Sequence, residues 1–118
     1  MKIWLVGAGI MAQDYAKVLL SLGSSFEVIG RGEESAKHFS ENLGKAVRIG
    51  GVEKALTSLD MPDAAIIAVG VVDLAETAIT LLNGGIKHIL VEKPGGIDSS
   101  EIKYLNRIAR DHKASVYV

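Results

Sequence analysis

The sequence predicts an α/β fold in which one doubly wound parallel sheet has six strands in the order 3-2-1-4-5-6. Short runs rich in valine and isoleucine alternate with longer stretches of helical apolar spacing, which is typical of βαβ units. Several short runs are apolar at consecutive positions, as expected for strands that helices cover on both faces. The chain has 118 residues, of which 48% are hydrophobic, and this length predicts one domain over residues 1–118.

Six segments qualify as the strands of this sheet, because each is short and rich in valine or isoleucine. Trp4, within the first of them, is expected in the core. Parallel connections are almost always right-handed, which makes the predicted strand order the simplest topology. In chain order the predicted strands are Lys2–Val6, Phe26–Gly30, Ala46–Ile49, Ala64–Val69, His88–Val91 and Ser115–Val118.

Five stretches between the strands have the apolar spacing of amphipathic helices. Glycines end three of them, at Gly23, Gly44 and Gly84-Gly85, since glycine commonly follows the last residue of a helix. Asp98, with Glu101 three positions later, is a capping-box pattern that starts the fifth helix. The predicted inward positions are, in order, Met11, Tyr15, Val18, Leu19 and Leu22; Ala36, Phe39 and Leu43; Val52, Ala55, Leu56 and Leu59; Leu74, Ala78, Leu81 and Leu82; and Ile102, Leu105, Ile108 and Ala109.

A glycine-rich turn, Gly7-Ala8-Gly9-Ile10-Met11-Ala12, directly follows the first predicted strand and opens the first helix. In this context the GxGxxG/A pattern indicates a Rossmann fold that binds a dinucleotide. Gly7 permits the tight turn, Gly9 lets a pyrophosphate approach the backbone, and the small Ala12 lets the helix pack closely on the strand. We therefore expect residues 7–11, namely Gly7, Ala8, Gly9, Ile10 and Met11, to contact the cofactor at the positive end of the helix dipole. The alternative is a glycine turn that binds nothing.

The end of the second strand bears on the choice between NAD and NADP. An acidic side chain there hydrogen-bonds the 2′-hydroxyl of NAD, whereas an arginine accommodates the 2′-phosphate of NADP. The strand ends at Gly30 without a carboxylate, and Arg31 follows directly. This favours NADP, with NAD as the alternative, because Glu33 can also reach a ribose. Glu33 and Glu34 are expected in the first turn of the second helix, where negative charge is stabilised.

Four segments of the chain also match the pattern of a known family. They are the glycine-rich turn, the run from Pro62 to Ala68, the helix that leads to Gly84-Gly85, and Val91-Glu92-Lys93-Pro94-Gly95-Gly96. With them the chain resembles, over essentially all of its length, the two-domain nicotinamide-dependent oxidoreductases of the Gfo/Idh/MocA family. Glu92-Lys93-Pro94 is the most specific of these motifs.

The resemblance implies hydride transfer between the nicotinamide and the carbinol carbon of a sugar or polyol. It also implies that Lys93 is the catalytic residue, that Glu92, Lys93 and Pro94 lie at the cofactor, and that the Lys93–Pro94 peptide bond is cis. The position agrees on physical grounds, because open α/β sheets bind ligands at the carboxyl ends of their strands. A partly desolvated lysine there can orient a hydroxyl or transfer a proton. The alternative is a surface Glu-Lys pair before a turn.

Two departures from the family pattern affect the expected site. After the fourth strand, Val69-Gly70 replaces Thr-Pro, and Leu74 replaces a histidine, so cofactor contacts from Val69 and Gly70 must come from backbone and small side chains. The substrate domain of the family is missing from these 118 residues. We therefore expect a cofactor-binding fragment that is monomeric and inactive alone, and the sequence gives no substrate identity.

Composition excludes several other function classes. Thirteen basic and 14 acidic residues give a net charge of -1, whereas binding nucleic acid requires a clustered basic excess. No apolar run approaches the ~20 residues of a membrane helix, and no convincing signal-peptide cleavage site is present. The absence of cysteine fits a reducing cytoplasm and removes thiol chemistry. No metal-ligand spacing is present, and His38, His88 and His112 are expected to be structural or solvated.

Two functions of other classes stay open at this point. The chain can be a stand-alone module that binds NAD(P) and reports its redox state to a partner protein. It can also bind coenzyme A or another nucleotide, because one fold supports many ligands. Glu92-Lys93-Pro94 favours the dehydrogenase over both alternatives.

Overall fold

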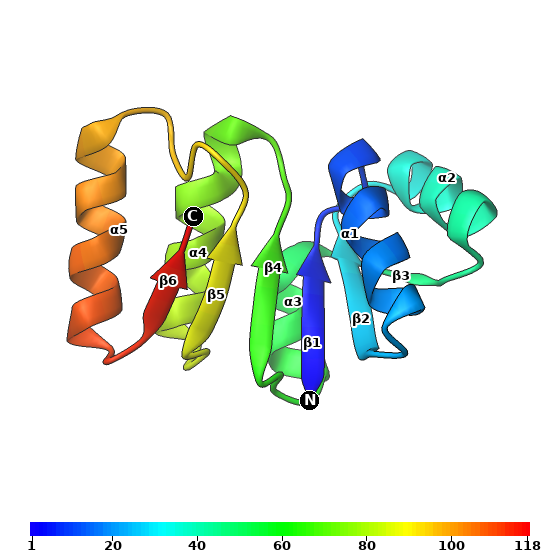
Figure 1. Cartoon of the computed structure of the whole chain (residues 1–118), viewed down its shortest axis with the longest axis horizontal. Helices are drawn as coiled ribbons and strands as arrows, with labels where there is room; N and C mark the ends of the chain where they lie inside the picture. The colour runs from blue at the N-terminus through cyan, green and yellow to red at the C-terminus, as the bar shows by residue number, and fades with distance from the viewer.

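Six short apolar segments pair into one all-parallel sheet in the computed structural model, which describes residues 1–118. The strand order is β3-β2-β1-β4-β5-β6, which confirms the predicted topology. Every pair of neighbouring strands is parallel, as the arrows of β1, β4, β5 and β6 in Figure 1 illustrate, so the carboxyl ends of the strands share one edge. The strands are β1 (Lys2–Val6), β2 (Ser25–Gly30), β3 (Val47–Ile49), β4 (Ala64–Ile67), β5 (His88–Val91) and β6 (Ser115–Tyr117).

The register of the central strands brings three loops together. Val6, the last residue of β1, pairs with Ile29 of β2 on one side and with Ile67 of β4 on the other. The chain therefore leaves β1, β2 and β4 at the same height. The strand order reverses between β1 and β4, and this is the position where doubly wound sheets form their ligand crevice. β4 ends at Ile67, two residues earlier than predicted, so Val69 belongs to the loop.

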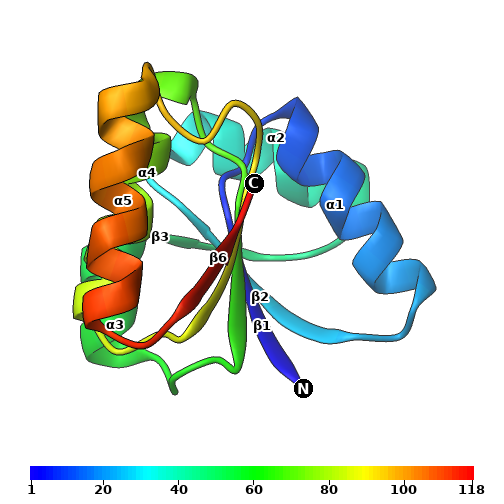
Figure 2. The ribbon, with the colours of Figure 1, turned by 60° about the vertical axis from the view of Figure 1, so that its left-hand side comes forward.

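Helices cover the two faces of the sheet in separate groups (Figure 2). One apolar cluster joins α1 and α2 to the sheet, and a larger one joins α3, α4 and α5 to the opposite face. None of the helices combines the length and the apolar character that a membrane crossing requires. The helices are α1 (Ile10–Ser21), α2 (Glu33–Leu43), α3 (Gly51–Ser58), the short 3-10 helix η1 (Val71–Asp73), α4 (Leu74–Asn83) and α5 (Ser99–Asp111).

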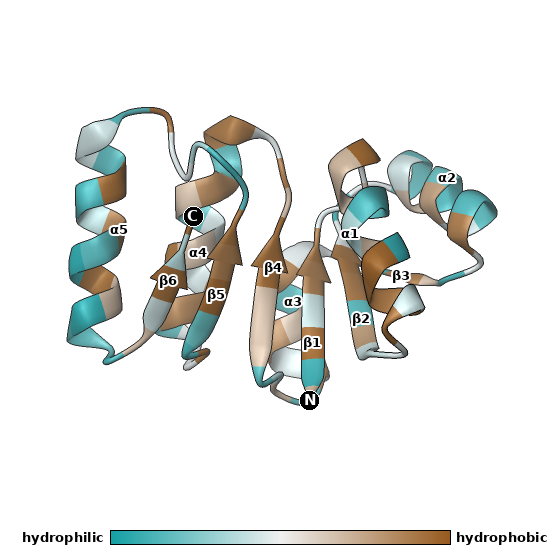
Figure 3. Cartoon of the chain, viewed as in Figure 1, coloured by the Kyte–Doolittle hydropathy of each residue, from teal (hydrophilic) through white to brown (hydrophobic).

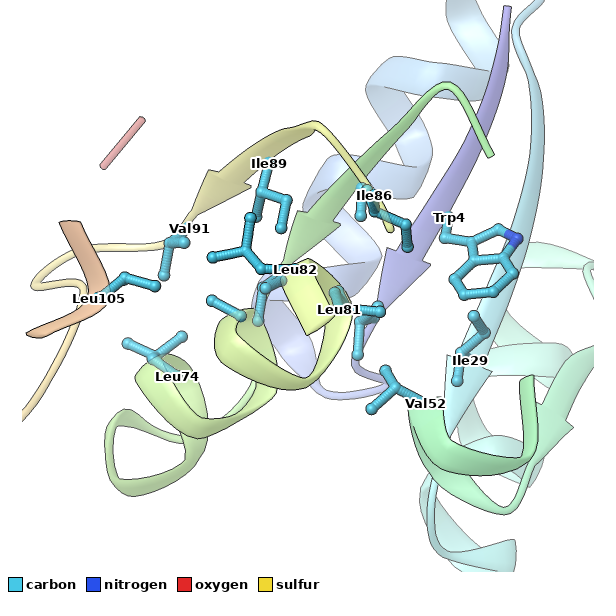
Figure 4. Packing of buried hydrophobic residues seen from close by; sticks show 14 of the residues in the cluster. Trp4, Ile29, Val52, Leu74, Leu81, Leu82, Ile86, Ile89, Val91 and Leu105 are labelled. Carbon is cyan, nitrogen blue, oxygen red and sulfur yellow. The ribbon is translucent and has the colours of Figure 1, made fainter. Parts of the chain in front are cut away.

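The larger cluster holds most of the core. Trp4 of β1 lies in it fully buried, as predicted, together with Leu81 and Leu82 of α4 (Figure 4). Leu105 is the fully buried anchor of α5. Figure 3 shows the division between core and surface: the strands are mainly apolar, and α5 is mainly polar along its outer side. Burial of this apolar surface is the main term that stabilises the fold.

The buried face of the first helix only partly matches the predicted one: Leu19 is buried and Tyr15 packs against the core, as predicted. Met11, Val18 and Leu22, expected to point inward, are 47%, 57% and 72% exposed. The buried positions are Ala12, Ala16 and Leu19. Two alanines in this contact let α1 approach the sheet closely, whereas larger side chains would hold it away. Met11 is therefore not a core residue, and the prediction for it was wrong.

One half of the sheet face that carries α1 and α2 has no helix over it. In Figure 1 no helix lies in front of β4, β5 and β6, whereas α1 lies in front of β2. Side chains along β5 alternate accordingly: His88 and Leu90 are exposed, whereas Ile89 and Val91 are buried. This open half borders the segment that contains Glu92 and Lys93.

Candidate functional site

The glycine-rich turn after β1 is shaped by its contact with the loop after β4. Gly7 has a φ of +126°, which residues other than glycine rarely adopt. A Cβ on Gly7 would lie 2.3 Å from the carbonyl oxygen of Ala68. Around Gly9, in contrast, a Cβ would meet no heavy atom within 4 Å. The fold therefore requires glycine at position 7, whereas Gly9 leaves open space at the amino end of α1.

A cavity of about 260 Å³ opens at the carboxyl edge of the sheet. Its walls come from the loops after β1, β2 and β4 and from the amino end of α3. Six of the predicted cofactor-binding residues line it: Gly7, Ala8, Gly9, Arg31, Val69 and Gly70. Five others do not line it: Ile10, Met11, Glu92, Lys93 and Pro94. The structure thus brings the glycine-turn part of the predicted site to one cavity, and the segment around Lys93 lies outside that cavity.

The helices that begin around this cavity lack side-chain caps. The N-cap residues of α1, α2 and α3 are Gly9, Gly32 and Gly50, and none offers a side-chain acceptor. The amino end of α5, away from the cavity, is capped: Asp98 Oδ1 accepts a 2.9 Å hydrogen bond from the Glu101 N–H, as predicted. The first N–H groups of a helix have no intrahelical partner. Around the cavity they remain available to an anionic ligand.

Arg31 and Glu53 form an ion pair beside the cavity, with Arg31 Nη2 and Glu53 Oε1 3.1 Å apart. Glu53 lies in the first turn of α3. Glu33 and Glu34 begin α2 as expected, and neither lines the cavity. The carboxylate that pairs with Arg31 therefore belongs to a residue 22 positions later in the chain. No sequence pattern pointed to Glu53, because a glutamate in a first helical turn is common.

The segment after β5 is held to α1 by a charge-assisted hydrogen bond. The Tyr15 hydroxyl donates to Glu92 Oε2, across 77 positions of the chain. This hydrogen bond to a carboxylate, with burial and the Glu92 charge, raises the pKa of Tyr15 to about 12. The Lys93–Pro94 peptide bond is cis, as the family resemblance implied. Tyr15 was predicted only as an inward-facing helical residue, so its contact with Glu92 was missed.

Lys93 lies at the carboxyl edge of the sheet, directly after β5, with its side chain exposed. It forms no ion pair within the chain. The family resemblance implied that Lys93 lies at the cofactor. Lys93 is not among the residues that line the cavity.

A larger hollow of about 870 Å³ lies at the other end of the molecule, between α5 and the edge strand β6. Its lining includes Tyr104, Arg107 and Tyr117. It is a shallow groove, without a glycine turn or a helix amino end. The smaller cavity at the strand ends is therefore the better candidate for a ligand site.

The strand order, the glycine turn after β1 and the uncapped helix ends together define a dinucleotide-binding domain of the Rossmann type. The chain belongs to the Gfo/Idh/MocA family, because the model described as "Oxidoreductase family, NAD-binding Rossmann fold" matches residues 1–118. None of the curated proteins matches the chain.

Solved structures with the same fold include a Gfo/Idh/MocA family oxidoreductase from Vibrio cholerae, 23% identical with a TM-score of 0.85. Biliverdin reductase from Synechocystis, solved with biliverdin and NADP+, is 24% identical with a TM-score of 0.80. The WlbA dehydrogenase from Bordetella pertussis, solved with NADH and UDP-GlcNAcA, is 16% identical with a TM-score of 0.85. These matches cover 100%, 99% and 100% of this chain, but only 38%, 37% and 34% of the respective structures. The chain spans about a third of their length.

Proposed function

We propose that this chain is the cofactor-binding part of an oxidoreductase that acts on a sugar or polyol. The bound nicotinamide supplies the hydride chemistry, in which a hydride passes between the carbinol carbon of the substrate and the nicotinamide ring. The protein's contribution is to bind and orient the cofactor. The observation that carries this proposal is the cavity at the ends of β1, β2 and β4, lined by the glycine turn.

The residues around the cavity fit a dinucleotide. Gly9, Gly32 and Gly70 leave open space where a Cβ would otherwise stand, so phosphate oxygens can approach the backbone. The uncapped amino ends of α1 and α2 offer N–H donors and the positive end of a helix dipole. A cavity of about 260 Å³ encloses only part of a dinucleotide. In our proposal it takes the adenosine and pyrophosphate, and the nicotinamide end extends toward the segment after β5.

NADP(H) is the preferred cofactor in this proposal. Arg31 lines the cavity directly after β2, and its guanidinium can form a charge-assisted pair with a 2′-phosphate. Gly30 places no carboxylate at that strand end. The wall formed by Val69 and Gly70 contributes backbone and small side-chain contacts.

Lys93 is the proposed catalytic residue, supported by the Glu92-Lys93-Pro94 motif and by its place at the carboxyl edge. It would hold the substrate hydroxyl and assist its proton transfer. Glu92, Lys93 and Pro94 would border the nicotinamide, and Ile10 and Met11 would border the pyrophosphate from the first turn of α1. In a full-length parent enzyme, Lys93→Met should lower kcat by about 10² to 10⁴, with a much smaller change in cofactor affinity.

Titration calorimetry with NADPH and NADH tests the cofactor assignment on the 118-residue chain. We expect NADPH to bind more tightly, and Arg31→Ala to weaken NADPH about 10- to 100-fold while changing NADH less than about 2-fold. Arg48→Ala is the matched control, because Arg48 forms a similar exposed ion pair, with Glu27, away from the cavity. A clear NADH preference, or no effect of Arg31→Ala, would mean that Glu33 or backbone groups bind the ribose.

The isolated chain should bind the cofactor without turnover and should be largely monomeric. Substrate-dependent NADPH production from NADP+ by the purified chain, with a panel of sugars and polyols, would disprove the first expectation. Light scattering over a concentration series tests the second. Leu90 on the open half of the sheet is the kind of exposed apolar residue that would drive association instead.

A further inference from the structure

We propose that Glu53 is a specificity-determining residue that lowers the affinity of the site for NADP(H) without affecting NAD(H). This inference rests on the proposed function, since it concerns the same cofactor site. Its basis is the ion pair between Glu53 and Arg31, the side chain expected to receive the 2′-phosphate. A carboxylate that already occupies the guanidinium competes with a phosphate for it.

The backbone before α3 places Glu53 where it can do this. Gly50 and Gly51 both have positive φ, at 112° and 73°, and the chain turns through them into the first turn of α3. The ion pair packs directly over Gly51: a Cβ there would lie 2.9 Å from Glu53 Oε2 and 3.4 Å from Arg31 Cζ. Glycine at this position therefore leaves the space that the pair occupies.

The two partners have different relations to the cavity. Arg31 lines it, whereas Glu53 does not. Glu53 therefore acts on a ligand through the guanidinium and through its own charge. Because NAD(H) has no 2′-phosphate, it leaves the ion pair intact. NADP(H) must share the guanidinium with the carboxylate or displace it.

Two opposing effects decide whether Glu53 raises or lowers the affinity for NADP(H). Arginine has five N–H donors, so Arg31 can contact a carboxylate and a phosphate together. The two anions would then lie about 5–7 Å apart, within one Debye length at physiological salt, and would repel each other. In the other direction, Glu53 could help NADP(H) by fixing the orientation of Arg31. The two side chains are 69% and 56% exposed, and such surface pairs order their partners only weakly. Repulsion and competition therefore dominate.

Calorimetric titration of Glu53→Gln with NADPH and NADH tests the inference. Glutamine keeps the shape of the side chain and removes the charge. We expect NADPH to bind about 10-fold more tightly at ~20 mM salt and about 3-fold more tightly at ~0.3 M salt, because screening weakens the repulsion. NADH affinity should change less than about 2-fold. Glu27→Gln, which removes the carboxylate of the exposed Glu27–Arg48 pair, is the control and should change neither affinity.

The other outcomes overturn the inference in distinguishable ways. Weaker NADPH binding by Glu53→Gln would make Glu53 a residue that positions Arg31, and weaker NADH binding would make it a ribose ligand. An unchanged ratio of the two affinities would remove any role. In an Arg31→Ala background the gain should become smaller, because only direct repulsion by the Glu53 charge is left; an undiminished 10-fold gain would refute competition for the guanidinium. If the unmodified chain binds neither cofactor, the proposed function itself fails.

Discussion

The substitution Gly7→Ala should destabilise the whole domain. Its Cβ would lie 2.3 Å from the carbonyl oxygen and 2.9 Å from the carbonyl carbon of Ala68, closer than unstrained contacts allow. Both atoms belong to the backbone, so no side chain can rotate away. Gly7 also has a φ of +126°, and strained backbone of this kind costs about 1–3 kcal/mol. Displacing the packed loop adds about 1–3 kcal/mol.

These two effects together are large for a domain of this size, whose total stability is about 5–15 kcal/mol. We expect Gly7→Ala to lower the free energy of unfolding by about 2–6 kcal/mol and the Tm by roughly 10 °C or more. Urea unfolding can be followed by the fluorescence of Trp4, the only tryptophan, which is fully buried in the core. A variant as stable as the unmodified chain would refute the contact between the two loops.

Gly9→Ala is the matched control, two positions further along the same turn. Gly9 has an extended conformation, with φ −86° and ψ −166°, and no heavy atom within 4 Å of a Cβ. Alanine as an N-cap costs at most about 1 kcal/mol relative to glycine. The added methyl group would, however, stand where a pyrophosphate must approach the backbone, so NADPH affinity should fall about 10-fold or more. Unchanged affinity would mean that the phosphates bind elsewhere.

Two further predictions concern other parts of the site. The pKa of Tyr15 is raised to about 12 in the folded chain, against ~10 when unfolded, so its stabilising contribution is complete below pH 10 and is lost between pH 10 and 12. Urea unfolding at pH 9 and at pH 11.5 measures this loss for the unmodified chain and for Tyr15→Phe. After allowance for partial exposure, the free energy of unfolding of Tyr15→Phe should fall by about 1 kcal/mol less over this range than that of the unmodified chain. Equal losses in the two proteins would contradict the Glu92 contact. The second prediction concerns 2′-phospho-ADP-ribose, which is NADP without the nicotinamide ring. Its affinity, measured by calorimetry, should be within about 10-fold of that of NADP+, because Glu92 and Lys93 do not line the cavity. An affinity more than 100-fold weaker would place the main binding energy at the nicotinamide.

Most of the fold follows from local signals in the sequence. Consecutive apolar residues such as Ile66 and Ile67 identify the buried strands, and the right-handed rule for parallel connections makes the observed order the simplest topology. The buried face of α1 did not follow, because hydrophobic periodicity favours the largest apolar side chains. The contact instead uses Ala12 and Ala16, since close approach of helix and sheet selects small residues.

The predicted site residues that line one cavity are mostly adjacent in sequence. The glycine turn is one continuous motif after a strand, and Arg31 is fixed by its place at the end of β2. The pairs Arg31–Glu53 and Tyr15–Glu92 join positions 22 and 77 residues apart. Such pairs depend on the tertiary packing of α3 and α1, and neither glutamate has a local pattern that names its partner.

The two ends of the site are built differently, and this has a consequence for how the chain would work. The glycine turn is fixed by backbone contacts, such as the one between Gly7 and Ala68, and lies in a formed cavity. Lys93 is exposed, and the segment around it is tied to the domain through the hydrogen bond from Tyr15 to Glu92. In the proposed function, hydride transfer near Lys93 would require water to be excluded around the reacting atoms. An exposed lysine beside an uncovered sheet face meets that requirement only when something covers it. Under the proposed function, these 118 residues would therefore bind the cofactor by themselves, whereas chemistry at Lys93 would also need the open half of the sheet to be covered.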